Sequence, residues 1–188
     1  MPQPAQDSPW YSLRIGPVAI VLMSTEHDFS RSSAQLSALD ALLTKIDRAA
    51  TPWVVFGGHR PMYTDTSYVA PSCAPLQALV EPLFRRHAVD VALWGHHHSY
   101  QRSCSMTRGQ CVGNHADAAA GVVHTVIGAA GYEFSPIAEG ADIPNWVEYA
   151  DNATYGFGMI DATKSTFHFQ FVRSDGRGVL DEFTLHKR

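Results

Sequence analysis

Apolar and polar positions along the first part of the chain follow strand-like and helix-like patterns in turn. Residues 11–23 predict two short strands around Gly16-Pro17, and the apolar run at residues 18–22 is typical of a strand buried on both faces. Leucine and isoleucine then recur at helical spacing between residues 36 and 46. With Ser32 or Ser33 as its cap, we predict a helix that runs to about Ala49.

The same alternation continues over residues 53–94. Residues 53–56 predict a second buried strand and residues 89–94 predict a third, and glycine and histidine follow each of them. Between these strands, residues 75–87 predict a helix with leucine and valine on one side. Strands and helices that alternate with short connections indicate α/β layering.

The last third of the chain carries strand patterns alone. Strands are predicted at residues 122–127, 156–160, 166–172 and 179–185, with a hairpin turn at residues 174–178. The predicted fold class is therefore α/β, with mixed β-sheets flanked by helices.

Composition narrows the function classes. The chain has 188 residues, which fits one domain or one domain with a small appendage. Its 14 Lys and Arg against 18 Asp and Glu give no basic excess that would indicate nucleic acid or a membrane surface as a partner. The 10 histidines are the unusual feature, and they raise the question of metal binding.

Three of these histidines follow predicted strands, and two of them, His59 and His96, stand directly after glycine. His59 follows the second buried strand, and His96 and His98 follow the third. Ligands bind at the carboxyl ends of strands in α/β sheets, and imidazole suits zinc, iron and manganese. In an extended loop His96 and His98 point the same way and His97 points away. A single histidine after a strand is more often a satisfied polar residue, and three in a row also suit a solvated turn, but two such sites in one layer favour ligands.

The sequence around these histidines resembles that of the purple acid phosphatases, within the calcineurin-like metallophosphoesterases. Residues 58–63 read GHRPMY and resemble a block of that family, and residues 95–102 read GHHHSYQR and resemble its GHVHAYER block. Residues 24–29, 155–158 and 167–169 are also similar to family segments, so the resemblance covers nearly the whole chain.

The resemblance implies a fold and a division of the chain. It implies the C-terminal half of the metallophosphoesterase αββα sandwich. Residues 1–112 would form the C-terminal part of the catalytic domain, and residues 113–188 a β-rich segment packed on it.

The resemblance also implies a dinuclear metal centre that hydrolyses small phosphate esters at acidic pH. His59 and His96 would bind the divalent ion, which is Zn(II), Mn(II) or Fe(II), and His98 would bind Fe(III). Arg60, Tyr100 and Arg102 would support the loop rather than react. His27 is either a donor or acid near the substrate phosphate or a surface-loop histidine. The other histidines lack ligand spacing and are interpreted as structural or solvated: His87, His115, His124, His168 and His186.

The family's remaining ligand motifs, GDxG, GDxxY and GNHE, are absent from this sequence. Asn114-His115 echoes GNHE but follows the His98 block, so its order is wrong. Neutral imidazoles cannot offset about five positive charges on two metal ions. We therefore expect this chain alone to bind at most one divalent ion, weakly, through His59 and His96 with His98 as a further candidate, and to be inactive or very weak.

Three functions remain open. The first is an acid phosphatase that hydrolyses phosphate monoesters, of which this sequence would be the C-terminal half, with apolar strand faces left exposed. The second is a truncated, non-catalytic remnant that acts as a binding or interaction module. The third is a phosphodiesterase or nucleotide pyrophosphatase of the same fold. Residues 63–73 and 132–152 are the long loops that could line a pocket. The protein partner considered is a second copy of this chain, in a homodimer that completes the site.

Cysteine and glycosylation patterns bear on localisation. Cys104 and Cys111 flank a short polar loop and are candidates for a disulfide, which would leave Cys73 over. Asn152-Ala153-Thr154 fits the N-glycosylation pattern. Together with the usual location of members of the family that the sequence resembles, these features favour a secreted, extracellular or vacuolar/lysosomal protein, although no signal peptide is recognisable.

Overall fold

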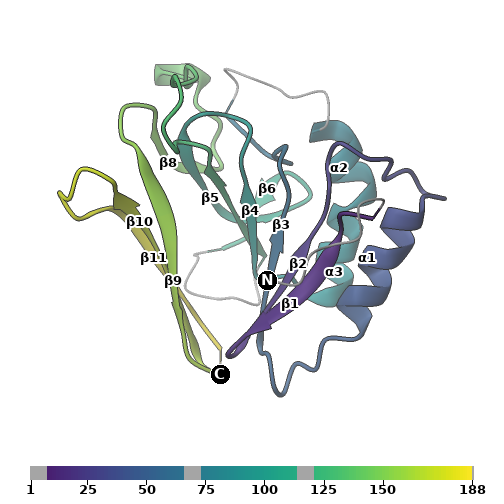
Figure 1. Ribbon diagram of the computed structural model, residues 1–188. Helices are drawn as coiled ribbons and strands as arrows, with labels where there is room; N and C mark the ends of the chain where they lie inside the picture. The colour runs from purple at the N-terminus through teal and green to yellow at the C-terminus, as the bar shows by residue number, and fades with distance from the viewer. Residues whose placement is uncertain (1–7, 66–72, 114–120, 188) are drawn as a thin grey trace.

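The computed structural model describes residues 8–65, 73–113 and 121–187 (Figure 1). Eight strands form one mixed sheet with the order β1-β2-β3-β4-β7-β5-β6, and β8 pairs with β5. They are β1 (Tyr11–Ile15), β2 (Val18–Leu22), β3 (Trp53–Gly57), β4 (Val91–Trp94), β5 (Tyr100–Thr107), β6 (Gln110–Cys111), β7 (Val122–Ile127) and β8 (Val147–Asp151). The strands β2, β3, β4 and β7 run parallel to one another.

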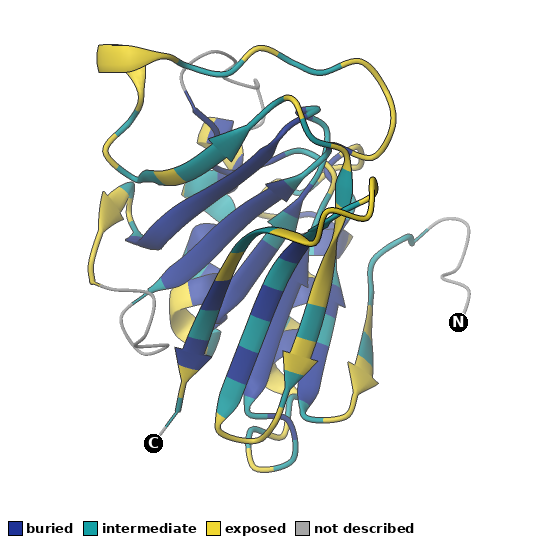
Figure 2. Cartoon of the chain, turned by 90° about the vertical axis from the view of Figure 1, so that its left-hand side faces the viewer, coloured by how far each residue is buried: buried dark blue, intermediate teal, exposed yellow. Residues whose placement is uncertain are grey.

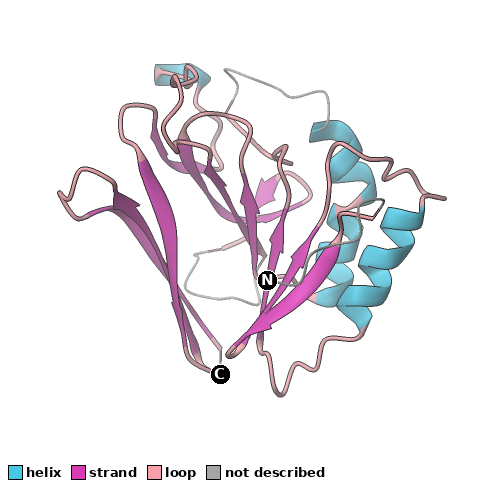
Figure 3. Ribbon diagram, in the orientation of Figure 1, coloured by secondary structure: helices cyan, strands magenta, loops and turns pink. Residues whose placement is uncertain are grey.

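A second, three-stranded sheet and three helices complete the fold. The small sheet is antiparallel and has the order β11-β10-β9, with β9 (Gly156–Ala162), β10 (Thr166–Arg173) and β11 (Val179–His186). The helices are α1 (Ala34–Thr44), α2 (Cys73–Leu79) and α3 (Glu81–His87), with a 3-10 turn at Gly140–Asp142. Figure 3 shows the helices on one face of the large sheet and the small sheet on the other, which confirms α/β layering.

The central strands are apolar throughout because both of their faces are covered. On β3, Val54 and Phe56 pack in the core under the helices, whereas Trp53 and Val55 pack in the core under the small sheet. All four are at most 1% exposed. This is the physical reason for the continuous apolar run, because a strand covered on one face only would alternate.

The small sheet, by contrast, is covered on one face. Along β10, Phe167, Phe169 and Phe171 are buried against the large sheet, and the residues between them are half-buried. Figure 2 shows this alternation as bands along the strand. On β9 the large apolar side chains of Phe157 and Met159 are 56% and 46% exposed.

Both predicted helices differ from the structure at their ends. The first is capped by Ser33, whose Oγ accepts from Leu36 N at 3.1 Å, but it ends at Thr44 rather than near Ala49. Asp47 ends it early, because its side chain and carbonyl accept hydrogen bonds from the backbone and side chains of the next residues and form a turn.

The predicted helix at residues 75–87 is in fact two helices, α2 and α3, that meet at Val80. Pro82 explains the break. Proline has no N–H to continue the α2 ladder and is tolerated only in the first turn of a helix, where α3 places it.

The strand β5 was not predicted, and it contains Tyr100 and Arg102, whose role in supporting the histidine loop stays a prediction. Both are buried residues of this strand. Its run of glutamine, arginine and serines hides the strand pattern, because these polar residues are buried rather than exposed. The strand β8, which pairs with β5, was also not predicted.

Tyr100 and Arg102 join the two sheets. Arg102 Nε and Nη2 donate to the carboxylate of Asp181 on β11 at 2.6 and 3.0 Å, and its Nη1 donates to Glu148 on β8 at 2.7 Å. The hydroxyl of Tyr100 donates to the same Asp181 at 2.7 Å. Burial opposes the charge of Arg102, but the hydrogen bonds that it donates to Asp181 and Glu148 outweigh this effect and raise its pKa. The guanidinium is therefore a structural cation.

The strands β7 and β8 belong to the large sheet although they follow residue 113. The division of the chain into residues 1–112 and 113–188 stays a prediction. No described helix combines the length and the hydropathy that crossing a membrane would require.

Candidate metal centre

The histidines His59 and His96 meet at the carboxyl edge of the large sheet. They follow β3 and β4, which are adjacent and parallel. Their loops are bonded to each other, since Gly95 N donates to His59 O at 2.9 Å and Gly58 N donates to Leu93 O at 3.1 Å. The loops pack tightly at Gly58, where a Cβ atom would lie 2.8 Å from the Trp94 ring.

The two imidazole rings are spaced as ligands of one ion would be. The Nδ1 atom of His96 lies 3.1 Å from the Nε2 atom of His59, and the rings are nearly perpendicular, at 78°. Two nitrogens bound at about 2.05 Å to a tetrahedral ion are separated by roughly 3.3 Å. In this structure the separation is that of a hydrogen bond, because Arg60 Nη1 can only donate to His96 Nε2 and thus leaves the His96 proton on Nδ1, facing His59 Nε2. A divalent ion between these two nitrogens would replace that proton.

The surroundings of His96 disfavour its charged form and lower its pKa. Burial lowers the pKa of His96 first, and the positive charges of Arg60 and His59 lower it further. Arg60 Nη1 lies 3.4 Å from His96 Nε2. A neutral imidazole is the form that binds a metal.

Arg60 is held at this edge by Glu26, a residue that the sequence analysis did not single out. Its Nε and Nη2 donate to the two carboxylate oxygens of Glu26 at 2.8 and 3.1 Å. The signal for Glu26 was present, because it lies in the segment at residues 24–29 that resembles the family. Arg60 also donates its backbone N–H to Thr25.

His98 is bound by the loop that follows β7. Its Nδ1 lies 2.8 Å from the carbonyl oxygen of Glu133, to which it donates. Its backbone N–H donates to Ser135 Oγ and its carbonyl accepts from Ser135 N, each at 3.0 Å. With Nδ1 carrying the proton, Nε2 keeps the lone pair that a metal ligand needs. His97 points inward instead, as the spacing predicts, and is 2% exposed.

The full dinuclear ligand set does not fit the described residues. Among them, no group of three or more histidine, cysteine, aspartate or glutamate side chains is arranged to hold a metal ion. The roles of His59, His96 and His98 as ligands stay predictions.

His27 lies on the loop after β2, apart from the strand-end histidines. Its Nδ1 lies 2.8 Å from Ser24 Oγ, and its ring meets the ring of Trp10 edge to face. The ring is exposed. Asn114 and His115 lie outside the described residues.

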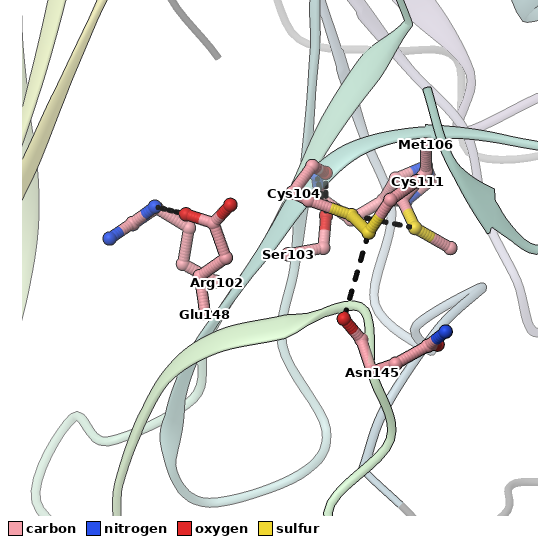
Figure 4. Close-up of a disulfide and its surroundings, with 8 residues drawn as sticks. Arg102, Ser103, Cys104, Met106, Cys111, Asn145 and Glu148 are labelled. Carbon is pink, nitrogen blue, oxygen red and sulfur yellow. Dashed lines mark hydrogen bonds and ion pairs between the residues drawn. A yellow bond between two sulfur atoms is a disulfide. The ribbon is translucent and has the colours of Figure 1, made fainter. Parts of the chain in front are cut away.

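The cysteine pairing is confirmed. Cys104 and Cys111 form a disulfide that joins β5 to β6, with Cα atoms 5.7 Å apart. Figure 4 shows Cys111 directed toward the carbonyl oxygen of Asn145. Cys73 is buried, and its thiol donates to the carbonyl of Pro61.

An apolar groove borders the histidine loops, in line with the expected exposure of strand faces. It has a volume of about 430 Å³ and runs across the carboxyl ends of β2, β3 and β4. Gly58 and Gly95 form its end next to the histidines. The other lining residues are mainly apolar: Pro9, Tyr11, Ile20, Leu22, Met23, Val55, Gly57, Leu93, Trp94 and Ile127.

Comparison with known proteins agrees with this fold. Residues 11–100 match the calcineurin-like phosphoesterase family, and residues 121–182 match the family described as iron/zinc purple acid phosphatase-like protein C. The solved structure of purple acid phosphatase PPD1 from yellow lupin (Lupinus luteus) seeds superposes with a TM-score of 0.81 at 24% identity. That match covers 97% of this chain and 34% of the lupin chain, and it shows the fold.

Two curated relatives match nearly the whole chain. "Probable inactive purple acid phosphatase 9" of Arabidopsis thaliana is 36% identical over 186 residues, which cover 92% of this chain and 28% of that protein. "Nucleotide pyrophosphatase/phosphodiesterase" of Hordeum vulgare is 28% identical over 188 residues, which cover 95% of this chain and 50% of that protein. The chain thus spans half or less of the length of these relatives. By both family matches and by its fold, the chain belongs to the purple acid phosphatases, within the calcineurin-like metallophosphoesterases.

Proposed function

We propose that this chain provides the histidine side of a metallophosphoesterase centre, which hydrolyses phosphate monoesters when ligands from outside the described residues complete it. The observation that carries the proposal is the 3.1 Å separation of His96 Nδ1 and His59 Nε2 at the ends of two adjacent parallel strands. Zn(II), Mn(II) and Fe(II) are the ions that such an imidazole pair suits. Fe(III), with His98 as its ligand, belongs to the completed centre only.

The chain's own groups suit a phosphate ester. The Arg60 guanidinium, fixed by Glu26, adds positive charge beside His96. Positive charge arranged before the reaction favours an anionic phosphoryl group. A bound divalent ion would supply Lewis-acid polarisation of a phosphoryl oxygen and a water of lowered pKa.

The isolated chain is proposed to bind one divalent ion weakly and to have little or no turnover. Two neutral imidazoles bring no negative charge to offset the ion, and the described residues add no carboxylate ligand. A complete site would come from further chain, as the greater length of the relatives suggests, or from a homodimer. A phosphate ester is the proposed small-molecule substrate, and a secreted or vacuolar location stays a proposal.

Zinc titration of the metal-free chain by calorimetry tests the proposed site. We expect His59→Ala and His96→Ala each to weaken the zinc affinity by at least about tenfold, because each removes one of two ligands. His98→Ala should change it by less than about threefold, and His168→Ala, on the outer face of β10, is the surface control. Equal affinity in the parent and His96→Ala chains would refute the site.

Activity gives a second test. The zinc- and iron-supplemented chain should hydrolyse p-nitrophenyl phosphate no faster than background, and its sedimentation should be measured in the same buffer. Metal-dependent turnover by a monomer would refute the missing-ligand argument. Turnover that appears only with a dimer would assign the missing ligands to the second copy.

A second candidate function is a binding or interaction module without catalysis. The observation that favours it is the apolar groove of about 430 Å³ beside the histidine loops. The name of the Arabidopsis relative also contains the word inactive. A diesterase or nucleotide pyrophosphatase activity is the third candidate, and the barley relative carries that name. Parallel assays with a phosphate monoester, a diester and a nucleotide pyrophosphate on a completed enzyme separate these candidates.

A further inference from the structure

The turn between β8 and β9 is docked on the loop that holds His98. Asn152 Nδ2 donates to Ser135 O at 3.0 Å, and Gly156 N donates to Ala129 O at 3.0 Å. The rings of Phe134 and Tyr155 stack with centroids 4.4 Å apart. Three separate contacts therefore join residues 152–156 to residues 129–135.

Ser135, which accepts the hydrogen bond from Asn152, also contacts His98 directly. Its Oγ accepts from His98 N, and its own N–H donates to His98 O. Two residues earlier in the loop, the Glu133 carbonyl accepts from the His98 ring. The position of residues 133–135 thus decides both where the His98 backbone lies and which ring nitrogen of His98 carries the proton.

We propose that Asn152 is a positioning residue for His98. By holding the Ser135 carbonyl, its amide keeps the Glu133 carbonyl on His98 Nδ1 and so leaves Nε2 as the ring nitrogen that carries the lone pair. The functional importance of this arrangement rests on the proposed role of His98 as a metal ligand. The positioning itself is a property of the metal-free chain and is tested there.

The turn has its own support, which makes Asn152 separable from it. Asp151 Oδ1 accepts from Ala153 N at 3.1 Å and from Thr154 N at 2.8 Å. These bonds fix the turn without the Asn152 side chain. Removing the amide of Asn152 should therefore release the Ser135 carbonyl and leave the turn in place.

Asn152 also heads the glycosylation pattern Asn152-Ala153-Thr154, and the two roles make different demands. A glycan requires the Thr154 hydroxyl, whereas the hydrogen bond to Ser135 does not. Thr154→Ala is therefore a matched control, because it abolishes the acceptor pattern and keeps the Asn152 amide. Asn152→Asp keeps the shape of the side chain and removes the donor.

The test is the tautomer of His98 in the 15N-labelled, metal-free full chain, read from long-range 1H–15N spectra near pH 8. A His98→Gln chain assigns the signals. In the parent and in Thr154→Ala we expect the Nδ1–H tautomer to dominate. In Asn152→Ala and Asn152→Asp we expect the ratio of Nδ1–H to Nε2–H to fall by roughly threefold to tenfold, the effect of weakening one hydrogen bond. Urea unfolding of each variant shows that the chain is folded.

Each outcome decides the matter. An unchanged tautomer ratio in both Asn152 variants overturns the inference, and so does an equal change in Thr154→Ala. A change confined to the Asn152 variants supports it. Failure of the zinc site leaves this result intact, because the spectra are recorded without metal. The zinc titration can therefore refute the proposed metal site while the positioning role of Asn152 holds, and the spectra can refute the positioning role while the metal site holds.

Discussion

His124 should make the protein less stable at the acidic pH where an acid phosphatase would work. This histidine of β7 is 3% exposed, and burial lowers its pKa to about 3. It is packed between aromatic rings, including those of Trp94 and Tyr63, and its Nδ1 accepts from Trp94 Nε1 at 3.1 Å. The folded state therefore holds the neutral ring, whereas the unfolded chain protonates it near pH 6.5.

The sign and size of the effect follow from proton linkage. Below pH 6.5 the unfolded state binds one more proton than the folded state, so the free energy of unfolding falls as the pH falls. The slope is about 1.36 kcal/mol per pH unit. Between pH 7.5 and pH 5.0 the loss from His124 is therefore about 2 kcal/mol, and it continues until the pH approaches 3.

Urea unfolding of the parent and of His124→Gln at pH 7.5, 6.5, 5.5 and 5.0 isolates this contribution. Glutamine can accept the Trp94 hydrogen bond and does not titrate. From pH 7.5 to pH 5.0 the free energy of unfolding of the parent should therefore fall by about 2 kcal/mol more than that of His124→Gln. His168→Gln, a substitution of the histidine paired with Glu182 on the surface, is the control for a general histidine effect. Parallel pH profiles for the parent and His124→Gln would refute the reasoning.

Two further predictions concern the links within the fold. Arg102→Met should lower the free energy of unfolding by about 3–5 kcal/mol, because it removes the cation beside the Asp181 carboxylate and leaves that carboxylate with the Tyr100 hydroxyl, whereas Arg177→Met at a fully exposed ion pair should cost much less. Urea unfolding measures both, and equal costs would contradict the structural role of Arg102. Reduction of the Cys104–Cys111 disulfide, which closes a separation of 7 residues, should lower the stability by about 2.5 kcal/mol, and an unchanged urea midpoint with reductant would contradict it.

The sequence was most informative where one physical rule acted alone. The strands at Trp53–Gly57 and Val91–Trp94 were predictable because burial on both faces demands apolar residues at every position. The glycines and histidines at their ends were predictable as a site for the same reason, since parallel strands end at one edge. The disulfide was predictable from the close spacing of two cysteines.

Prediction failed where long-range pairing decided the outcome. The strand Tyr100–Thr107 carries buried polar groups, and partners far along the chain, such as Asp181 and Glu148 for Arg102 and His124 for Ser103, offset the cost of their burial. The roles of Glu133 and Ser135 beside His98 were equally hidden. One contributes a backbone carbonyl, which leaves no trace in the side-chain sequence.

The charge of the histidine loops explains why similarity in this segment does not identify an activity. The described candidate ligands at this edge are imidazoles, which carry no negative charge, and the carboxylate of Glu26 is engaged by Arg60. Negative charge for two metal ions must then come from other ligands, so the number of ions held, and with it the reaction, is set outside this ligand set. Relatives with the different names "probable inactive" and "pyrophosphatase/phosphodiesterase" each match more than nine-tenths of this chain. A segment that positions imidazoles without supplying negative charge is compatible with an inactive protein and with either kind of enzyme. Measuring the number of metal ions bound per molecule of a protein that contains the remaining ligands distinguishes these cases.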